Sequence, residues 1–254
     1  MRARILLSSP TAAEVSGVID GGAGINTLDY SGYTIDLTVD LEAGTATGTG
    51  GVANIQNVTG GGGSDTLVGD SDENILIGGA GDDVLTGGLR ADTLDGGAGT
   101  DTVEEQRDAA FTLTDAALTI GLEGMDALLG IEQAVLIGGA GANTMDASGF
   151  AGTVALAGGE EDDIFMVNLG TYTVDGGTGN DTLVAGDKEN TWEITAGDAG
   201  TLNGSIFTSI ENLIGGAVAD SFVLAAGAMA TGLIDGRKGE DRLTGGNTAN
   251  TWRI

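Results

Sequence analysis

Five consecutive nine-residue units, each with glycine at its first position and most with a glycine pair, constrain the fold of this chain more than any other feature of its sequence. They are GGGGSDTLV, GDSDENILI, GGAGDDVLT, GGLRADTLD and GGAGTDTVE, and together they span residues 60–104. Self-similarity at a fixed short period is typical of solenoids, in which each unit buries its apolar side chains only against its neighbours. We therefore expect a stacked repeat fold.

The composition agrees with such a fold and limits the partners. The 254 residues include 48 glycines but only 4 % aromatic residues and one proline, so there is little bulk for a globular core. The formal net charge is −29, which disfavours binding to nucleic acid and favours binding of cations. The chain has no cysteine or histidine, which excludes disulfides, histidine-based zinc sites and imidazole bases.

Related glycine turns recur outside the tandem run, at residues 21–26, 138–143, 158–163, 176–181 and 215–220. Two longer echoes overlay them: residues 21–33 match 138–150, and residues 174–194 match 234–254 at an offset of 60. The second echo stops in mid-copy, so we expect the sequence to be a fragment of a longer repeat protein. No segment reaches transmembrane length, and we expect no membrane insertion.

Short β-branched and apolar runs lie between the turns and predict strands too short to be stable alone. These runs are residues 66–68, 75–77, 153–156, 164–167, 171–174 and 222–224. Residues 107–133 do not follow the repeat spacing. The segment MDALLGIEQAVL is compatible with a short helix by composition, but the flanking strand signals favour an irregular coil of the same solenoid. We expect residues 1–14 to be disordered, residues 15–104 to form the tandem roll and residues 105–254 to form a more degenerate continuation.

The turns have the chemistry of a cation cradle. In G-G-x-G-x-D-x-U-x, where U is a large apolar residue, glycine permits positive φ and lets backbone carbonyls converge. The sixth-position aspartate adds a carboxylate, and an all-oxygen ligand set suits calcium better than magnesium. Residues seven to nine of each unit are expected to form the strand, with U pointing inward.

These units resemble the repeats-in-toxin (RTX, haemolysin-type) calcium-binding nonapeptides, most strongly over residues 60–104 and more loosely over residues 15–254. The resemblance implies an all-β fold, a right-handed parallel β-roll or β-solenoid, with Ca²⁺ between a turn and the turn eighteen residues later. It places the metal ligands at Gly61, Gly63, Asp65, Gly79, Gly81, Asp83, Asp92, Gly97, Gly99, Asp101, Asp163 and Asp181.

The resemblance also divides the aspartates between two edges of the roll. Asp65, Asp83 and Asp101 are expected to line one edge, and Asn74 and Asp92 the other, weaker edge, where Asp72 and Arg90 replace the fourth-position glycine. Asp163 aligns with Asp181 eighteen residues on, but Glu161 replaces a glycine there and weakens the prediction. The remaining acidic residues of the run 160–163 are expected to be a solvated turn, and Asn26 and Asn143 are expected to mark structural turns.

The favoured function is a non-catalytic calcium-binding region of a secreted bacterial exoprotein or adhesin, extracellular or on the cell surface, that folds and stiffens when calcium binds. The alternative is a β-helical polysaccharide-modifying enzyme or its accessory module, although the cationic residues are scattered and histidine is absent. In a third interpretation Trp192 and Trp252 contact a surface or glycan ligand. Their recurrence at the 60-residue offset favours a place in the repeat core or at a coil edge.

Overall fold

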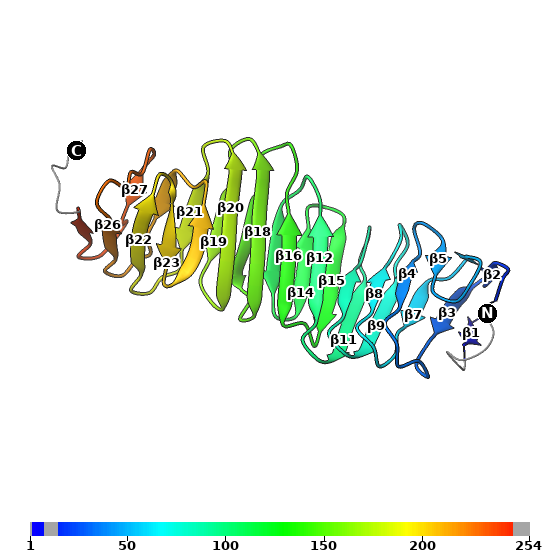
Figure 1. Cartoon of the computed structure of the whole chain (residues 1–254). Coiled ribbons are helices and arrows are strands. Elements are labelled where there is room, and N and C mark those ends of the chain that lie inside the picture. Colours follow the sequence, from blue (N-terminus) through cyan, green and yellow to red (C-terminus); the bar gives the residue numbers. More distant parts are fainter. Residues whose placement is uncertain (1, 8–14, 246–254) are drawn as a thin grey trace. The chain divides into compact units, whose positions relative to one another are not determined.

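The computed structural model describes residues 2–7 and 15–245, and its regular secondary structure there consists of strands alone (Figure 1). Within these residues no helix forms. Most of the strands pair in parallel with a strand of the next coil, which confirms the predicted all-β β-roll architecture. The helical alternative for MDALLGIEQAVL is excluded, because that segment supplies most of β15 (Gly124–Leu129) and of β16 (Gln133–Ile137).

The described chain divides into two units. The first comprises the residues up to Glu105 together with Asp115–Val135, and the second comprises Gln106–Thr114 together with the residues from Leu136 onward. In the sequence, the three boundaries fall within β12 (Thr102–Gln106), directly after β13 (Phe111–Thr114) and within β16.

The first unit contains two main arrays of strands and one small pair. One array has the order β1-β3-β7-β9-β11-β15-β14 and the other the order β12-β10-β8-β4-β5, while β2 pairs with β6. The strands of the first array are β1 (Arg2–Leu6), β3 (Ile25–Asp29), β7 (Asn57–Thr59), β9 (Ile75–Ala80), β11 (Thr93–Ala98), β15 and β14 (Ala117–Ile120). The remaining strands are β10 (Val84–Thr86), β8 (Thr66–Val68), β4 (Thr38–Asp40), β5 (Thr45–Ala46), β2 (Ile19–Asp20) and β6 (Val52–Ala53).

The second unit also has two arrays. Their orders are β13-β17-β19-β21-β25-β27 and β28-β26-β22-β23-β24-β20-β18. The first contains β13 (Phe111–Thr114), β17 (Thr144–Gly149), β19 (Ile164–Val167), β21 (Thr182–Ala185), β25 (Asn212–Ile214) and β27 (Ile234–Asp235). The second contains β28 (Arg242–Thr244), β26 (Ser221–Leu224), β22 (Thr191–Ala196), β23 (Ala199–Leu202), β24 (Ser205–Thr208), β20 (Thr171–Thr178) and β18 (Thr153–Glu160).

The coils follow an eighteen-residue register wherever the nonapeptides are tandem. Val84 of β10 pairs with Thr66 of β8 and with Thr102 of β12, and β9 pairs with β11 through the turn glycines as well as the strand residues. Other coils are longer because they contain a local antiparallel hairpin. In the first unit, β14 and β15 form an antiparallel hairpin, and β15 then pairs in parallel with β11. In the second unit, β22, β23 and β24 form an antiparallel set, and β24 then pairs in parallel with β20.

The U positions of the nonapeptides form the core of the tandem run. Leu67, Leu76, Leu85, Leu94 and Val103 are fully buried. Their neighbours on each strand alternate toward solvent, so one apolar side chain per half-coil is buried against its counterpart in the next coil.

Trp192 lies in the interior of the second unit. Its indole stacks on Phe222 with ring centroids 5.5 Å apart and meets Phe207 edge-on at 6.1 Å. The side chain is fully buried, so Trp192 is a core residue and its ring is not presented to an external ligand. Trp252 lies outside the described residues.

The N-terminal segment differs from its predicted disorder where it is described. Residues 2–6 form β1, which pairs in parallel with β3, and Leu7 donates a backbone hydrogen bond to Asp29. The Arg4 guanidinium also contacts the Asp29 carboxylate. An open strand edge of the roll therefore gives this segment hydrogen-bond partners that its own sequence does not reveal. Residues 8–14 lie outside the described part.

Candidate metal centre

The turn glycines allow successive coils to approach closely. A Cβ on Gly79, Gly81, Gly97 or Gly99 would lie under 3.0 Å from the carbonyl oxygen of the residue eighteen positions earlier, and all four residues have positive φ. The carbonyls they approach are those of Gly61, Gly63, Gly79 and Gly81. Glycine is required here both by backbone conformation and by space, and stacked carbonyl oxygens are the result.

The first column of carboxylates consists of Asp65, Asp83 and Asp101, all of which are buried. One oxygen of each carboxylate accepts a backbone hydrogen bond from the previous coil. The N–H of Asp65 donates to Oδ1 of Asp83 at 2.7 Å, and the N–H of Asp83 donates to Oδ1 of Asp101 at 2.8 Å. The three residues predicted to lie on one edge are therefore in direct register.

The second oxygen of Asp83 and of Asp101 is buried without a hydrogen-bond partner. In the turn that ends at Asp83, a Cβ on Gly78 would lie under 3.0 Å from both Asp83 Oδ2 and the carbonyl oxygen of Gly96. The Asp83 carboxylate oxygen and the Gly96 carbonyl oxygen thus converge with no hydrogen-bond donor between them. The space they face stays open because residue 78 has no side chain. Oxygen ligands that converge in this way fit a hard cation such as Ca²⁺.

The electrostatics of the first column also favour a cation. Burial raises the pKa of Asp83 to about 6, against a hydrogen bond from the Asp65 N–H, and the charges of Asp65 and Asp101 raise it further. Burial likewise raises the pKa values of Asp65 and Asp101. An ionised carboxylate in this column therefore lacks compensation from the protein alone.

The second column begins with Asn74 and Asp92 and differs in its charges. The N–H of Asn74 donates to Asp92 Oδ1 at 2.7 Å, which is the same register as in the first column. At the fourth position, however, Arg90 Nη1 lies 3.7 Å from Asp72 Oδ1, so the two residues that replace glycine form an exposed ion pair between adjacent coils. Burial, with the charges of Asp126 and Glu105, raises the pKa of Asp92 to about 7.

Two further carboxylates in the first unit continue these columns and a third lies beside Asp92, although no nonapeptide contains them. Asp126 Oδ1 accepts the N–H of Asp92 at 2.9 Å, and Glu132 Oε2 accepts the N–H of Asp101 at 3.0 Å. Glu105 Oε1 accepts the N–H of Gly87 at 3.0 Å. The first two continue the columns across long coils, so a search at a fixed period misses them.

In the second unit, Asp163 and Asp181 reproduce the geometry of the first column. Both are buried, the N–H of Asp163 donates to Asp181 Oδ1 at 2.8 Å, and Oδ2 of each lacks a hydrogen-bond partner. Glu161 adopts φ 65°, the left-handed conformation that the motif assigns to glycine, so its substitution leaves the turn intact. Glu160, Glu161 and Asp162 are exposed, as expected for a solvated turn.

Asp220 and Asp241 form another carboxylate pair in the second unit. The N–H of Asp220 donates to Asp241 Oδ1 at 2.9 Å, while Asp220 Oδ1 accepts the N–H of Asn190 at 3.0 Å. The signal for this pair was present in the sequence, since Asp220 ends a glycine turn and Asp241 lies in the 60-residue echo.

The ligand set is dispersed. Among residues 2–7 and 15–245, no three acidic side chains gather into a ready-made metal cage. Each turn instead contributes one carboxylate and several carbonyls, so an ion must be shared between coils. The same part of the chain contains no helix long and apolar enough to span a membrane.

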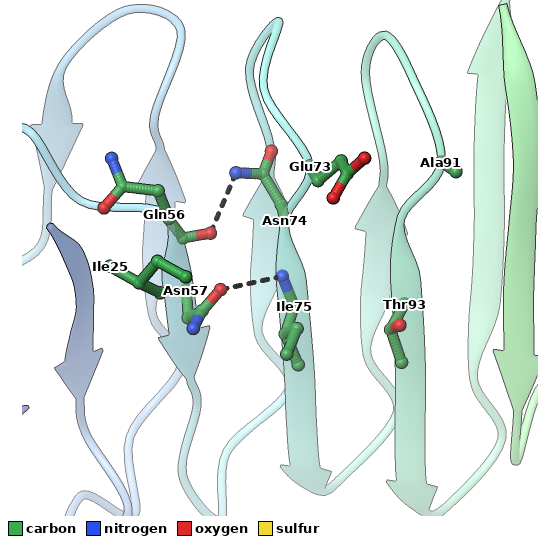
Figure 2. Close-up of a pocket in the computed structure, with 8 residues that line it drawn as sticks. All are labelled: Ile25, Gln56, Asn57, Glu73, Asn74, Ile75, Ala91 and Thr93. Carbon is green, nitrogen blue, oxygen red and sulfur yellow. Dashed lines mark hydrogen bonds between the residues drawn. The ribbon is translucent and has the colours of Figure 1, made fainter. Parts of the chain in front are cut away.

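A surface hollow of ≈ 250 Å³ lies beside the second column (Figure 2). Asn74 Nδ2 donates to the carbonyl of Gln56 at 2.8 Å, and the N–H of Ile75 donates to Asn57 Oδ1 at 3.1 Å, so amide groups tie these coils together. Glu73 is the single carboxylate among the lining residues, and the hollow therefore lacks the charge of a cation site.

Comparison with known families agrees with this geometry. The model of the RTX calcium-binding nonapeptide repeat matches four stretches of the chain, at residues 59–89, 77–104, 135–154 and 173–191. The chain therefore carries RTX calcium-binding nonapeptide repeats, which form β-rolls, bind Ca²⁺ and are non-catalytic. No curated protein matches the chain.

Proposed function

We propose that this chain is a non-catalytic region of a secreted or cell-surface protein, an exoprotein or adhesin, that folds and stiffens when calcium binds at its stacked turns. The observation that carries the proposal is the set of buried, unpartnered Oδ2 atoms of Asp83, Asp101, Asp163 and Asp181. A buried carboxylate oxygen without a hydrogen bond is costly unless a cation compensates it.

The proposed ligands are the aspartates of the columns and the glycine carbonyls that face them. In the tandem run, Asp83 lies between two sites, because its turn stacks on the turn of Asp65 and on that of Asp101. Asp163 and Asp181 form the corresponding pair in the second unit. A site between the turns of Asn74 and Asp92 would have one carboxylate fewer than a site in the first column. The Arg90 guanidinium also lies nearby, so we assign this site a lower affinity for calcium.

Calcium dependence of folding follows from the charge. With a net charge of −29, ionised carboxylates stacked at coil spacing repel one another, and binding to the folded state alone shifts the equilibrium toward it. Millimolar calcium outside the cell then favours the folded roll, whereas low calcium inside the cell favours the unfolded chain. This difference supports assembly after export.

The test is circular dichroism and calorimetric titration of the full chain, with Mg²⁺ as the control ion. We expect strand signal in calcium, its loss in chelator, and little recovery with Mg²⁺. A chain that binds no calcium, or whose spectrum is the same in calcium and in chelator, contradicts the proposal.

A further inference from the structure

A three-residue element recurs at the end of long coils, outside the nonapeptide pattern. Its copies are residues 54–56 (Asn-Ile-Gln), 130–132 (Gly-Ile-Glu) and 209–211 (Ser-Ile-Glu). The first residue has a left-handed backbone in every copy, with φ of 55°, 56° and 54°, and the central isoleucine is buried. Three matching backbones with an anchored isoleucine indicate one repeated structural element.

The third residue of this element takes the place of the next nonapeptide aspartate. Glu132 Oε2 accepts the N–H of Asp101 at 3.0 Å, and Glu211 Oε2 accepts the N–H of Asp181 at 2.7 Å. In the remaining copy, Gln56 Oε1 accepts the N–H of Asn26, also at 3.0 Å. The longer side chain reaches the hydrogen-bond donor that an aspartate Oδ1 caps in the tandem run.

The carbonyl of the element's first residue takes the place of the carbonyl that the first glycine of the next nonapeptide supplies in the tandem run. Gly130 O and Asp101 Oδ2 both lie under 3.0 Å from the position of a Cβ on Gly96. Ser209 O and Asp181 Oδ2 converge in the same way beside Gly176. This arrangement matches that of Asp83 Oδ2 and the Gly96 carbonyl at Gly78 in the tandem run.

The neutral copy shows what fills this space when no charge is present. Asn26 Nδ2 donates to Asn54 O at 2.9 Å and to Gly22 O at 3.2 Å, so an amide group satisfies the converging carbonyls. Asp101 and Asp181 have no such donor, and their fully buried Oδ2 atoms have no hydrogen-bond partner. The two acidic copies therefore require a cation where the neutral copy has a proton donor.

We propose that residues 130–132 and 209–211 are abbreviated calcium half-sites, which complete a Ca²⁺ site with Asp101 and with Asp181 respectively. The ligands are the aspartate Oδ2, the carbonyl of Gly130 or Ser209, and the carboxylate of Glu132 or Glu211. Residues 54–56 are the metal-free form of the same element. The inference rests on the proposed function, because it requires that the aspartate columns bind calcium.

The test is calorimetric titration of the full chain with Ca²⁺, with the fold of each variant checked by circular dichroism in saturating calcium. Glu132→Gln and Glu211→Gln keep the hydrogen-bond acceptor, as Gln56 does, but remove the charge. Each is expected to lose one Ca²⁺ per chain or to weaken one site by roughly tenfold or more. Glu42→Gln removes an exposed carboxylate between β4 and β5 and is expected to leave the titration unchanged.

The double variant Asn26→Asp with Gln56→Glu supplies the missing charges to the neutral copy and is expected to gain one Ca²⁺. A wild-type chain that binds calcium, with Glu132→Gln and Glu211→Gln matching it in stoichiometry and midpoint, overturns the half-site assignment alone. Failure of the double variant to gain an ion overturns the claim that charge distinguishes the copies. A wild-type chain that binds no calcium overturns the proposed function itself.

Discussion

Replacement of Asp83 by asparagine is expected to change stability in opposite directions with and without calcium. In the metal-free protein, Oδ1 still accepts the N–H of Asp65, while the unpartnered Oδ2 becomes an amide that faces the Gly96 carbonyl. Asn26 makes this kind of contact with Asn54 at 2.9 Å. Removing one unsatisfied buried polar atom stabilises a fold by about 1–3 kcal/mol.

With calcium the order is expected to reverse, because Asp83 lies between two proposed sites. A site saturated at one hundred times its Kd contributes about 2.7 kcal/mol, so the wild type gains about 5 kcal/mol from the two sites. Asp83→Asn forfeits most of this gain. This loss is larger than the gain of about 1–3 kcal/mol from removing the unsatisfied atom, so the variant is less stable than the wild type in calcium.

The assay is thermal unfolding followed by far-UV circular dichroism, in chelator and in saturating calcium, with the neighbouring exposed Asp82→Asn as a charge-matched control. For a chain of this size the midpoint moves by about 2–4 °C per kcal/mol. A lower midpoint of Asp83→Asn in chelator, or the same ranking of variant and wild type in both conditions, refutes the reasoning.

Three further outcomes are expected. In calcium titrations Asp83→Ala weakens binding more than Asp65→Ala or Asp92→Ala, because it serves two sites; equal midpoints and stoichiometry among the three contradict the two-edge arrangement. In chelator, the folded chain raises the pKa values of Asp83 and Asp181 from 3.8 to about 6, so their protonation stabilises the fold. This contribution to the free energy of unfolding is fully present below pH 3.8 and is lost as the pH rises through 6. The strand signal of the metal-free chain is therefore larger at about pH 5 than at about pH 8, and the reverse dependence excludes this linkage. Trp192→Ala costs about 3–5 kcal/mol through loss of core packing, measured by chemical unfolding in calcium, and a cost below about 1 kcal/mol contradicts a core role.

Much of the fold was predictable because one period governs both the turns and the core. The nine-residue spacing correctly gave the strands at 66–68 and 164–167 and the inward positions of Leu67 and Leu85. The alignment of Asp163 with Asp181 was also correct in register, although Glu161 replaces the glycine of the motif there. Local side-chain chemistry and coil spacing were sufficient for these features.

The glutamates that continue the columns were not predictable from that period. Glu132 meets Asp101 only because the coil between them contains the β14–β15 hairpin, and the length of that hairpin sets the spacing. A similar antiparallel set precedes Glu211. The strand at residues 2–6 was missed for a different reason, since its partner β3 and not its own composition determines its conformation.

The hairpins allow a coil to be longer in sequence without changing the step from one parallel strand to the next. After β14 and β15 turn back on each other, β15 pairs in parallel with β11, and β24 does the same with β20 after its own hairpin. The tips, near Leu122 and at Asn203–Gly204, are exposed and lie outside the parallel ladder. A foreign peptide grafted at either tip would thus be displayed at a fixed level of the roll, which makes these hairpins attachment points for engineering a display scaffold.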